Sequence, residues 1–211
     1  MSGDPTSFDS IRDARADKHS AQWWLLFAIL VANKPAEITT RKLNSFLDAL
    51  GVFGLTPFAK LRSSSPKKIE ASLRSVKTGQ YKRVLSAFLW LRNLSPDGDD
   101  PRIWGVPDVL ECVPGIGPKT ARWYTMLVEP DYRCAALDTH ILKFLRDNGV
   151  PDAPRATPPA GKTYQRLEDS FLAACDTVQM KPRDLDYLLW AVYRRGGKVL
   201  LNKKSVETVA K

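Results

Sequence analysis

The helical spacing of apolar residues constrains the fold of this chain more than any other feature. Nearly every periodic segment repeats apolar residues at intervals of three and four, and no segment alternates convincingly as a strand does. One such segment carries Val84, Leu85, Phe88 and Leu91 on a single face. Hydrophobic residues make up 44% of the 211 residues, which is enough to bury a core. The chain is therefore predicted to be all-α.

Prolines, glycines and capping residues set the predicted helix boundaries. Thr39 or Thr40 can cap the second helix, and Ser65-Pro66 is a typical N-cap followed by a proline in the first helical position. The tail from Gly196 onward is basic and less periodic, and residues 57–61 form at most one helical turn. The predicted helices cover 20–33, 39–50, 66–73, 80–93, 108–112, 118–128, 139–148, 162–180 and 183–195.

Charge and cysteine content narrow the function classes. A net charge of +9 favours an acidic polymer or surface as partner. Cys112, Cys134 and Cys175 are far apart and lack C-x-x-C spacing, so they predict buried thiols rather than a zinc site, an iron–sulfur cluster or a disulfide framework. Residues 1–18 do not resemble a signal peptide, and the apolar run 23–32 is too short to span a bilayer. We expect a soluble intracellular protein without a membrane partner.

The segment from Val113 to Ala121 reads Val-Pro-Gly-Ile-Gly-Pro-Lys-Thr-Ala and joins two predicted helices. Two glycines one residue apart allow a sharp turn and the close approach of a partner. The second helix directs unpaired N–H groups and its positive dipole end toward the turn, which is an arrangement that binds anions. The backbone amides from Gly115 to Lys119 can therefore contact a nucleic-acid phosphate without reading sequence. The alternative is a plain connection between antiparallel helices.

Two residues near this hairpin can carry chemistry. Lys119 lies in the first turn of a helix, where the dipole disfavours a protonated amine, and a neutral lysine can act as a nucleophile. Its alternative role is to contact phosphate or solvent. Asp138 precedes an amphipathic helix and can be a plain N-cap, but capping also fixes the orientation of a carboxylate. His140 is expected to be packed or solvated.

Together these segments resemble the helix–hairpin–helix superfamily of DNA glycosylases. The resemblance rests on Val113 to Ala121 and on Leu137-Asp138-Thr139-His140-Ile141, and it extends from about Ser20 to Arg195. It implies that Lys119 is the Schiff-base nucleophile of a bifunctional glycosylase and AP lyase, assisted by Asp138. The four-cysteine iron–sulfur site of the endonuclease III and adenine glycosylase relatives is absent from the sequence.

The C-terminal part is similar to compact archaeal-type 8-oxoguanine DNA glycosylases. The matching residues are Leu185-Asp186, Leu189-Trp190 and Gly197-Lys198-Val199-Leu200. In that family a C-terminal lysine helps to recognise the oxidised purine, but this chain continues for eleven residues past Leu200. That role is therefore not transferred to Lys211.

The resemblance and the residues together give a set of predicted site residues. Lys119 and Asp138 are the predicted catalytic residues. Trp123 could stack on an extruded base or pack between helices, Asn33 could fill the gap left by that base, and Asp186 and Trp190 could line the pocket. The predicted DNA-binding residues are Pro114, Gly115, Ile116, Gly117, Lys119 and Thr120.

The expected architecture has two helical lobes. One covers 20–131 and includes the hairpin, and the other combines 1–19 with 132–211, with the active-site cleft between them and Lys119 and Asp138 on opposite sides. The predicted partner is double-stranded DNA with a damaged base, bound by a monomer that is cytoplasmic in a prokaryote or nuclear in a eukaryote. No metal or other cofactor is expected, apart from an alkali ion that the hairpin backbone could bind.

The predicted reaction is removal of an oxidised base, with 8-oxoguanine as the first choice, followed by strand cleavage. An oxidised-pyrimidine enzyme without the cluster, a monofunctional glycosylase and a non-catalytic DNA-binding module remain as alternatives.

Overall fold

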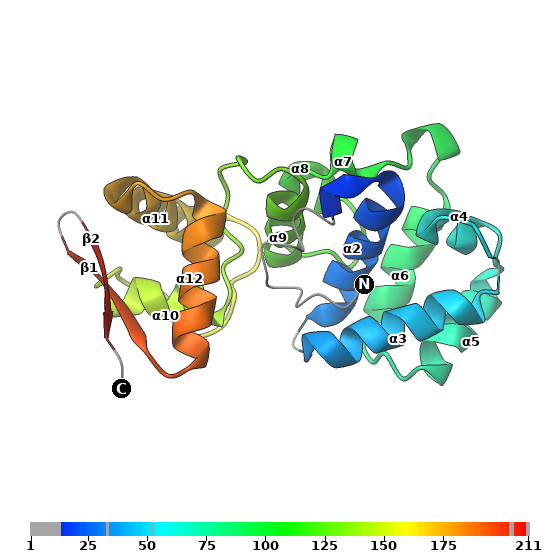
Figure 1. Cartoon of the computed structure of the whole chain (residues 1–211), viewed down its shortest axis with the longest axis horizontal. Coiled ribbons are helices and arrows are strands. Elements are labelled where there is room, and N and C mark those ends of the chain that lie inside the picture. The colour runs from blue at the N-terminus through cyan, green and yellow to red at the C-terminus, as the bar shows by residue number, and fades with distance from the viewer. Residues whose placement is uncertain (1–13, 33, 52, 203–204, 210–211) are drawn as a thin grey trace. The chain divides into compact units, whose positions relative to one another are not determined.

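The computed structural model describes residues 14–32, 34–51, 53–202 and 205–209 (Figure 1). Their contacts divide the chain into two compact units. Unit 1 contains Met1–Ile116 and Leu127–Glu129, and unit 2 contains Gly117–Met126 and Pro130–Lys211. Lys119 and Asp138 both fall in unit 2, because most of α9 (Pro118–Val128) groups with that unit. The lobes expected from the sequence, which divide the chain near residue 131, stay a prediction.

Unit 1 is built around α2 (Lys18–Val31), which is buried along most of its length. Helix α2 packs against α3, α4, α6 and α7, and α5 packs against α3 and α6. Gln22 in α2 links two loops, because its Nε2 donates to the Asp99 carbonyl and its Oε1 accepts from the Phe58 N–H. Further helical elements among the described residues of this unit are α3 (Ala36–Ala49), α4 (Pro57–Arg62), α5 (Pro66–Ser75), α6 (Tyr81–Arg92), the 3₁₀ turn η1 (Pro96–Gly98), α7 (Pro101–Trp104) and α8 (Pro107–Leu110).

Unit 2 packs α10 (Thr139–Asp147), α11 (Lys162–Val178) and α12 (Pro182–Arg194) against one another and against a β-hairpin (Figure 1). The two strands, β1 (Lys198–Asn202) and β2 (Ser205–Val209), pair antiparallel from Lys198 opposite Val209 to Asn202 opposite Ser205. Asn148 fixes the hairpin to the end of α10, since its amide donates to the Val199 carbonyl and accepts from the Leu201 N–H. The core of this unit includes Leu137, Leu142, Phe144, Phe171, Leu185 and Leu189.

The predicted all-α class is confirmed, and several helix boundaries agree closely with the predicted ones. Ser65 caps α5, Asp138 caps α10, and Pro118 opens α9. The prediction that no segment forms a strand is wrong for the tail, which contains β1 and β2. Val199 and Leu201 alternate toward the core of unit 2, but Leu200 on the other face obscures that alternation in the sequence.

Other local expectations are corrected as well. Helix α3 begins at Ala36, so neither Thr39 nor Thr40 is its cap, and the Thr39 hydroxyl instead donates to the Pro35 carbonyl within the helix. Cys134 and Cys175 are buried, but Cys112 is exposed. The 3₁₀ turn at Pro96–Gly98 and helix α7 lie between the predicted helices 80–93 and 108–112, where no helix was predicted. Among the described helices, none has the length and hydropathy needed to cross a membrane.

Candidate active site

The hairpin between α8 and α9 has the sharp turn that its glycines predict. Gly115 adopts a φ of +87°, and a Cβ at this position would come within 2.6 Å of the Arg83 carbonyl oxygen. A side chain is therefore excluded here twice, by the backbone conformation and by the close approach of α6. A Cβ added to Gly117 would meet nothing within 4 Å, so this position has open space.

The hairpin amides are not equivalent. The Ile116 N–H already donates to the Val113 carbonyl at 3.0 Å, and the Ile116 side chain is buried. Pro118 has no N–H, and the N–H groups of Lys119 and Thr120 lie in the first turn of α9, where a helix offers no acceptor. Pro114, Gly115 and Gly117 are exposed. Of the predicted DNA-binding residues, Ile116 thus serves the core and the turn, whereas the others remain accessible at least in part.

Asp138 is held by the backbone of the helix that it caps. Its Oδ1 accepts from the N–H groups of His140 and Ile141, both at 2.8 Å. Its Oδ2 accepts no hydrogen bond from the residues that the structure describes. The carboxylate is therefore fixed through one oxygen, and its other oxygen is left for a further partner.

A buried network positions the segment that leads to Asp138. Glu168 in α11 accepts from the Ala135 N–H and from Arg122 Nε, each at 2.7 Å through the same oxygen, Oε1. The side chains of Arg122 and Glu168 are 12% and 5% exposed. Since Arg122 lies one helical turn after Lys119 on α9, the ion pair and the Ala135 hydrogen bond connect the helix of the predicted nucleophile to the segment before Asp138.

Tyr164 extends this network. Its hydroxyl donates to the Ala135 carbonyl at 2.8 Å and accepts from the Leu137 N–H at 3.1 Å. The Arg122 guanidinium lies 4.5 Å from the centre of the Tyr164 ring, which is a cation–π distance. Burial raises the pKa of Tyr164, so its hydroxyl keeps its proton. The backbone from Ala135 to Leu137 is thus held by buried side chains of α11.

Sequence reasoning missed this network, although one signal for Glu168 was present. Tyr164, Leu167, Glu168 and Phe171 follow one another at helical spacing and are all buried. A carboxylate on the apolar face of a predicted helix must find a partner, because burying an unpaired charge is costly. The partner, Arg122, is 46 residues away, and no spacing rule connects the two.

Asp186 joins Lys119 and Asp138 in one charged cluster within unit 2. Burial raises the pKa of Asp186 well above its ordinary value, the nearby Asp138 carboxylate raises it further, and the positive charge of Lys119 acts in the opposite direction. Three residues singled out in the sequence, from three different segments, are therefore close enough to interact electrostatically. Two carboxyl groups beside one lysine favour a state in which one carboxyl keeps its proton.

The remaining predicted pocket residues have varied surroundings. Trp123 is half-buried and packs against Met126, Cys134 and Ala136 in unit 2. The Trp190 ring stacks with the guanidinium of Arg194 at 4.7 Å. Asn33 and Lys211 lie outside the described residues.

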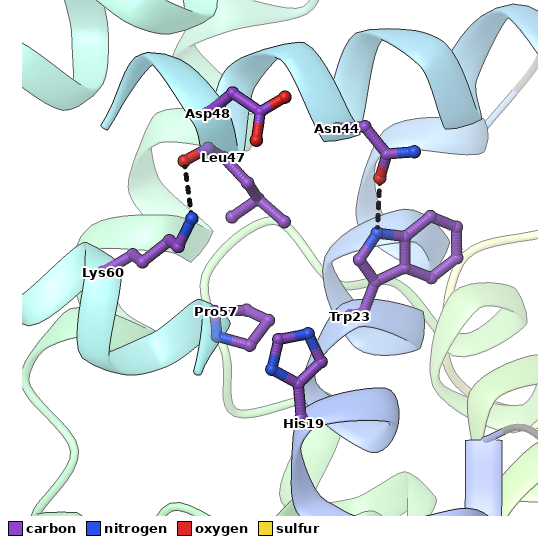
Figure 2. A pocket seen from close by; sticks show the side chains of 7 residues that line it. All are labelled: His19, Trp23, Asn44, Leu47, Asp48, Pro57 and Lys60. Atoms are coloured by element: carbon purple, nitrogen blue, oxygen red, sulfur yellow. Dashed lines mark hydrogen bonds between the residues drawn. The ribbon is translucent and has the colours of Figure 1, made fainter. Parts of the chain in front are cut away.

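A cavity of about 350 Å³ lies in unit 1 among α2, α3 and α4 (Figure 2). Two hydrogen bonds shape its wall, from Trp23 Nε1 to Asn44 Oδ1 at 2.9 Å and from Lys60 Nζ to the Leu47 carbonyl at 3.1 Å. The lining residues are His19, Trp23, Asn44, Leu47, Asp48, Pro57 and Lys60. None of them is a predicted site residue.

Comparison with known proteins gives a match in structure and none in sequence. No protein-family model and no curated protein sequence matches the chain. Among solved structures, the chain is similar to Methanocaldococcus jannaschii 8-oxoguanine DNA glycosylase, with a TM-score of 0.63, 20% identity, and coverage of 89% of this chain and 86% of that one. It is also similar to the 8-oxoguanine glycosylase/lyase of the same organism in complex with a 15mer DNA containing 8-oxoguanine, with a TM-score of 0.62, 18% identity and 88% coverage of both chains.

The chain therefore shares its fold with two archaeal 8-oxoguanine glycosylase structures, which is the fold that the sequence resemblance predicted.

Proposed function

We propose that this protein is a DNA glycosylase with AP lyase activity that removes an oxidised base. The observation that carries the proposal is the meeting of Lys119, Asp138 and Asp186 in one charged cluster. The cluster lies on a fold shared with two 8-oxoguanine glycosylase structures, one of which is described as a glycosylase/lyase bound to damaged DNA. A nucleophilic amine beside an oriented carboxylate is what a Schiff-base mechanism requires.

DNA binding is assigned to the hairpin. The amides of Lys119 and Thr120 at the start of α9 bind a backbone phosphate, and the open space at Gly117 lets that phosphate approach closely. Phosphate contacts fix the position of the duplex without reading its sequence. The damaged nucleotide leaves the stack to reach the chemistry, as in other enzymes that act on a base.

The reaction begins at Lys119. Its neutral Nζ attacks C1′ of the flipped nucleoside, the N-glycosidic bond breaks, and the base leaves with the bonding electron pair and takes up a proton. Asp138 stabilises the positive charge that develops on the sugar, and its Oδ2 accepts the proton that the amine loses. The C1′–O4′ bond then opens to a protonated imine, with O4′ taking up a proton. Loss of a C2′ proton and cleavage of the C3′–O bond release the 3′ phosphate, and water hydrolyses the imine.

The substrate is proposed to be 8-oxoguanine in duplex DNA, since both structural neighbours are named for that lesion. An oxidised pyrimidine is the alternative. A panel of duplexes, each with one defined lesion, tests the choice by the rate of strand cleavage. Cleavage that is faster on an oxidised pyrimidine than on 8-oxoguanine would move the proposal to the alternative. Truncation after Leu200 tests the tail, and retained cleavage of 8-oxoguanine duplexes would exclude a role for it.

Borohydride trapping tests the mechanism. We expect reduction to link the chain covalently to 8-oxoguanine duplex, and Lys119→Gln to abolish that product. Lys162→Gln is a matched control, because Lys162 also lies in the first turn of a helix after a glycine but is exposed in α11.

The other outcomes identify the alternatives. If Lys119→Gln still releases the base, and strand cleavage needs added alkali, the protein is a monofunctional glycosylase. If no lesion gives a trapped product or a free base while duplex binding persists, the hairpin is a non-catalytic DNA-binding module.

A further inference from the structure

Three cations gather at the C-terminal end of α2 in unit 1. Lys34 follows this helix, Lys42 lies on α3, and Arg83 lies on α6. Burial lowers the pKa of Lys34, and the neighbouring charges of Arg83 and Lys42 lower it further, so Lys34 lies near both of these cations. Burial also lowers the pKa of Arg83. We call Lys34, Lys42 and Arg83 the basic cluster.

The partners of the basic cluster are neutral. Lys34 Nζ donates to the Leu30 carbonyl at 2.8 Å, and Lys42 Nζ donates to the Lys77 carbonyl at 2.5 Å. Arg83 donates to the Ile29 carbonyl at 2.6 Å and to the Gln80 side chain at 2.9 Å. No ion pair joins any of the three to a carboxylate among the described residues. Half-buried like charges without a counter-charge are unfavourable, and an anion bound among them relieves that cost.

The basic cluster is connected directly to the hairpin. Arg83 Nη1 donates to the Gly115 carbonyl at 2.9 Å, and the Arg83 backbone and side chain fill the space where a Gly115 side chain would lie. An anion held by Arg83 and the two lysines therefore lies beside the turn at Gly115. On a duplex, the groups available at that place are further phosphates of the backbone.

We propose that Lys34, Lys42 and Arg83 form a second phosphate-binding surface, which holds the DNA backbone beside the turn at Gly115. This inference rests on the proposed function, since it takes DNA as the ligand. It adds a part of the interface that the hairpin motif does not contain. Arg83 has two roles in it, because the same guanidinium that meets the phosphate also supports the turn at Gly115.

Helix capping is the competing explanation. A lysine near the end of a helix can simply satisfy a carbonyl and interact with the helix dipole. Lys68 does this for α3, since its Nζ donates to the Leu50 carbonyl at 2.7 Å. Leu50 is eight residues, or about 12 Å of helix, beyond Lys42. Lys68→Gln thus removes the same kind of bond outside the basic cluster.

The experiment measures binding of the full chain to a short undamaged duplex over a range of salt concentrations. The variants are the double variant Lys34→Gln/Lys42→Gln and the control Lys68→Gln, with Arg83 left intact because it supports the hairpin. We expect the double variant to bind roughly tenfold more weakly at low salt. Its slope of log K against log salt should be shallower by about 1 to 2, since each phosphate contact contributes close to one unit. The control should match the wild type in both quantities.

A second readout separates this surface from the chemistry. At saturating abasic duplex, the double variant should be trapped by borohydride at the wild-type rate. If the wild type and the double variant have equal affinity and an equal slope of log K against log salt, the proposal of a second phosphate-binding surface is overturned, even if trapping succeeds. Conversely, a reduced slope without trapping in any variant would support the surface and overturn the proposed lyase.

Discussion

Two carboxyl groups of unit 2 have contrasting surroundings. Glu168 accepts a charged hydrogen bond from Arg122 and a backbone hydrogen bond from Ala135. Asp186 instead lies within electrostatic reach of a second carboxylate, Asp138, and of Lys119. The first carboxylate has a counter-charge bonded to it, whereas the second is influenced by charges of both signs.

This contrast distinguishes a carboxylate with a structural role from carboxyl groups that we propose take part in the reaction. A paired buried charge holds its neighbours rigidly, and removing either partner is costly. A carboxyl whose pKa is raised by burial and by a like charge keeps its proton to a higher pH than an ordinary carboxyl does, and such groups are common at active sites. We therefore expect changes at Glu168 to affect stability and changes in the Lys119 cluster to affect rate.

The largest expected effect is a lower rate of borohydride trapping in the variant Asp138→Asn. Asparagine caps a helix about as well as aspartate, so α10 should persist and the thermal unfolding temperature should change little. The trapping rate should fall by about 10²- to 10⁴-fold, because the proton acceptor is lost. Single-turnover trapping kinetics measure this. Asp17→Asn is the control, since Asp17 caps α2 by accepting from the Ser20 N–H and lies outside the cluster. A rate loss below threefold for Asp138→Asn would remove the catalytic assignment.

The next largest expected effect is a loss of stability in the variant Glu168→Ala. This variant removes the buried ion pair with Arg122 and the acceptor of the Ala135 N–H. We expect a loss of about 3–5 kcal/mol in the free energy of unfolding, measured by denaturant titration. Glu168→Gln keeps an acceptor for Ala135 and should lose less.

A matched control for Glu168 is available on the same helix. Asp176 pairs with Arg133 at 3.0 Å, but both side chains are more than half exposed. Asp176→Ala should cost less than about 1 kcal/mol. Equal losses for the two alanine variants would contradict the view that the Glu168 network is the structural support of this unit.

The smallest effect is the pH dependence that Asp186 contributes. Its pKa in the folded chain is raised above the ordinary carboxyl value of 3.8, so the folded state keeps this proton to a higher pH than the unfolded state does. The stability from Asp186 is complete below that ordinary value and is lost as the pH rises through the raised pKa. Asp186→Asn cannot ionise, so its unfolding temperature should gain on that of the wild type as the pH increases over this window.

A variant at Asp138 tests the direction of the pKa shift of Asp186. Removing the neighbouring charge with Asp138→Asn should lower the pKa of Asp186 and move its window to lower pH. A carboxyl-carbon NMR titration follows the group directly. Parallel pH profiles for the wild type and Asp186→Asn would show that Asp186 does not titrate as inferred.

The sequence predicts local features of this molecule better than long-range ones. Asp138, Ser65 and Pro118 act within a few residues of their own positions, and their capping roles are visible in the sequence. The hairpin at Gly115 is predictable for the same reason. The contact of Arg83 with that hairpin spans 32 residues, and it depends on how helices pack rather than on any motif.

The same limit applies to the candidate site. Two sequence motifs predict Lys119 and Asp138 as site residues, but the Glu168 network that connects their segments is a tertiary feature. The β-hairpin of the tail was missed because its strands are short and their inward residues, Val199 and Leu201, are separated by a third apolar residue. Asp186 was named from a resemblance, and its closeness to the other two charges required the folded chain.

The difference among the three cysteines has a practical consequence for spectroscopy. Burial raises the pKa values of Cys134 and Cys175 to about 12, whereas Cys112 is exposed just before the hairpin. Thiolates are the reactive species, so a maleimide fluorophore should label the native chain at Cys112 without any engineered substitution. A dye at this position would be three residues from Gly115 and would report the arrival of DNA as a change in emission.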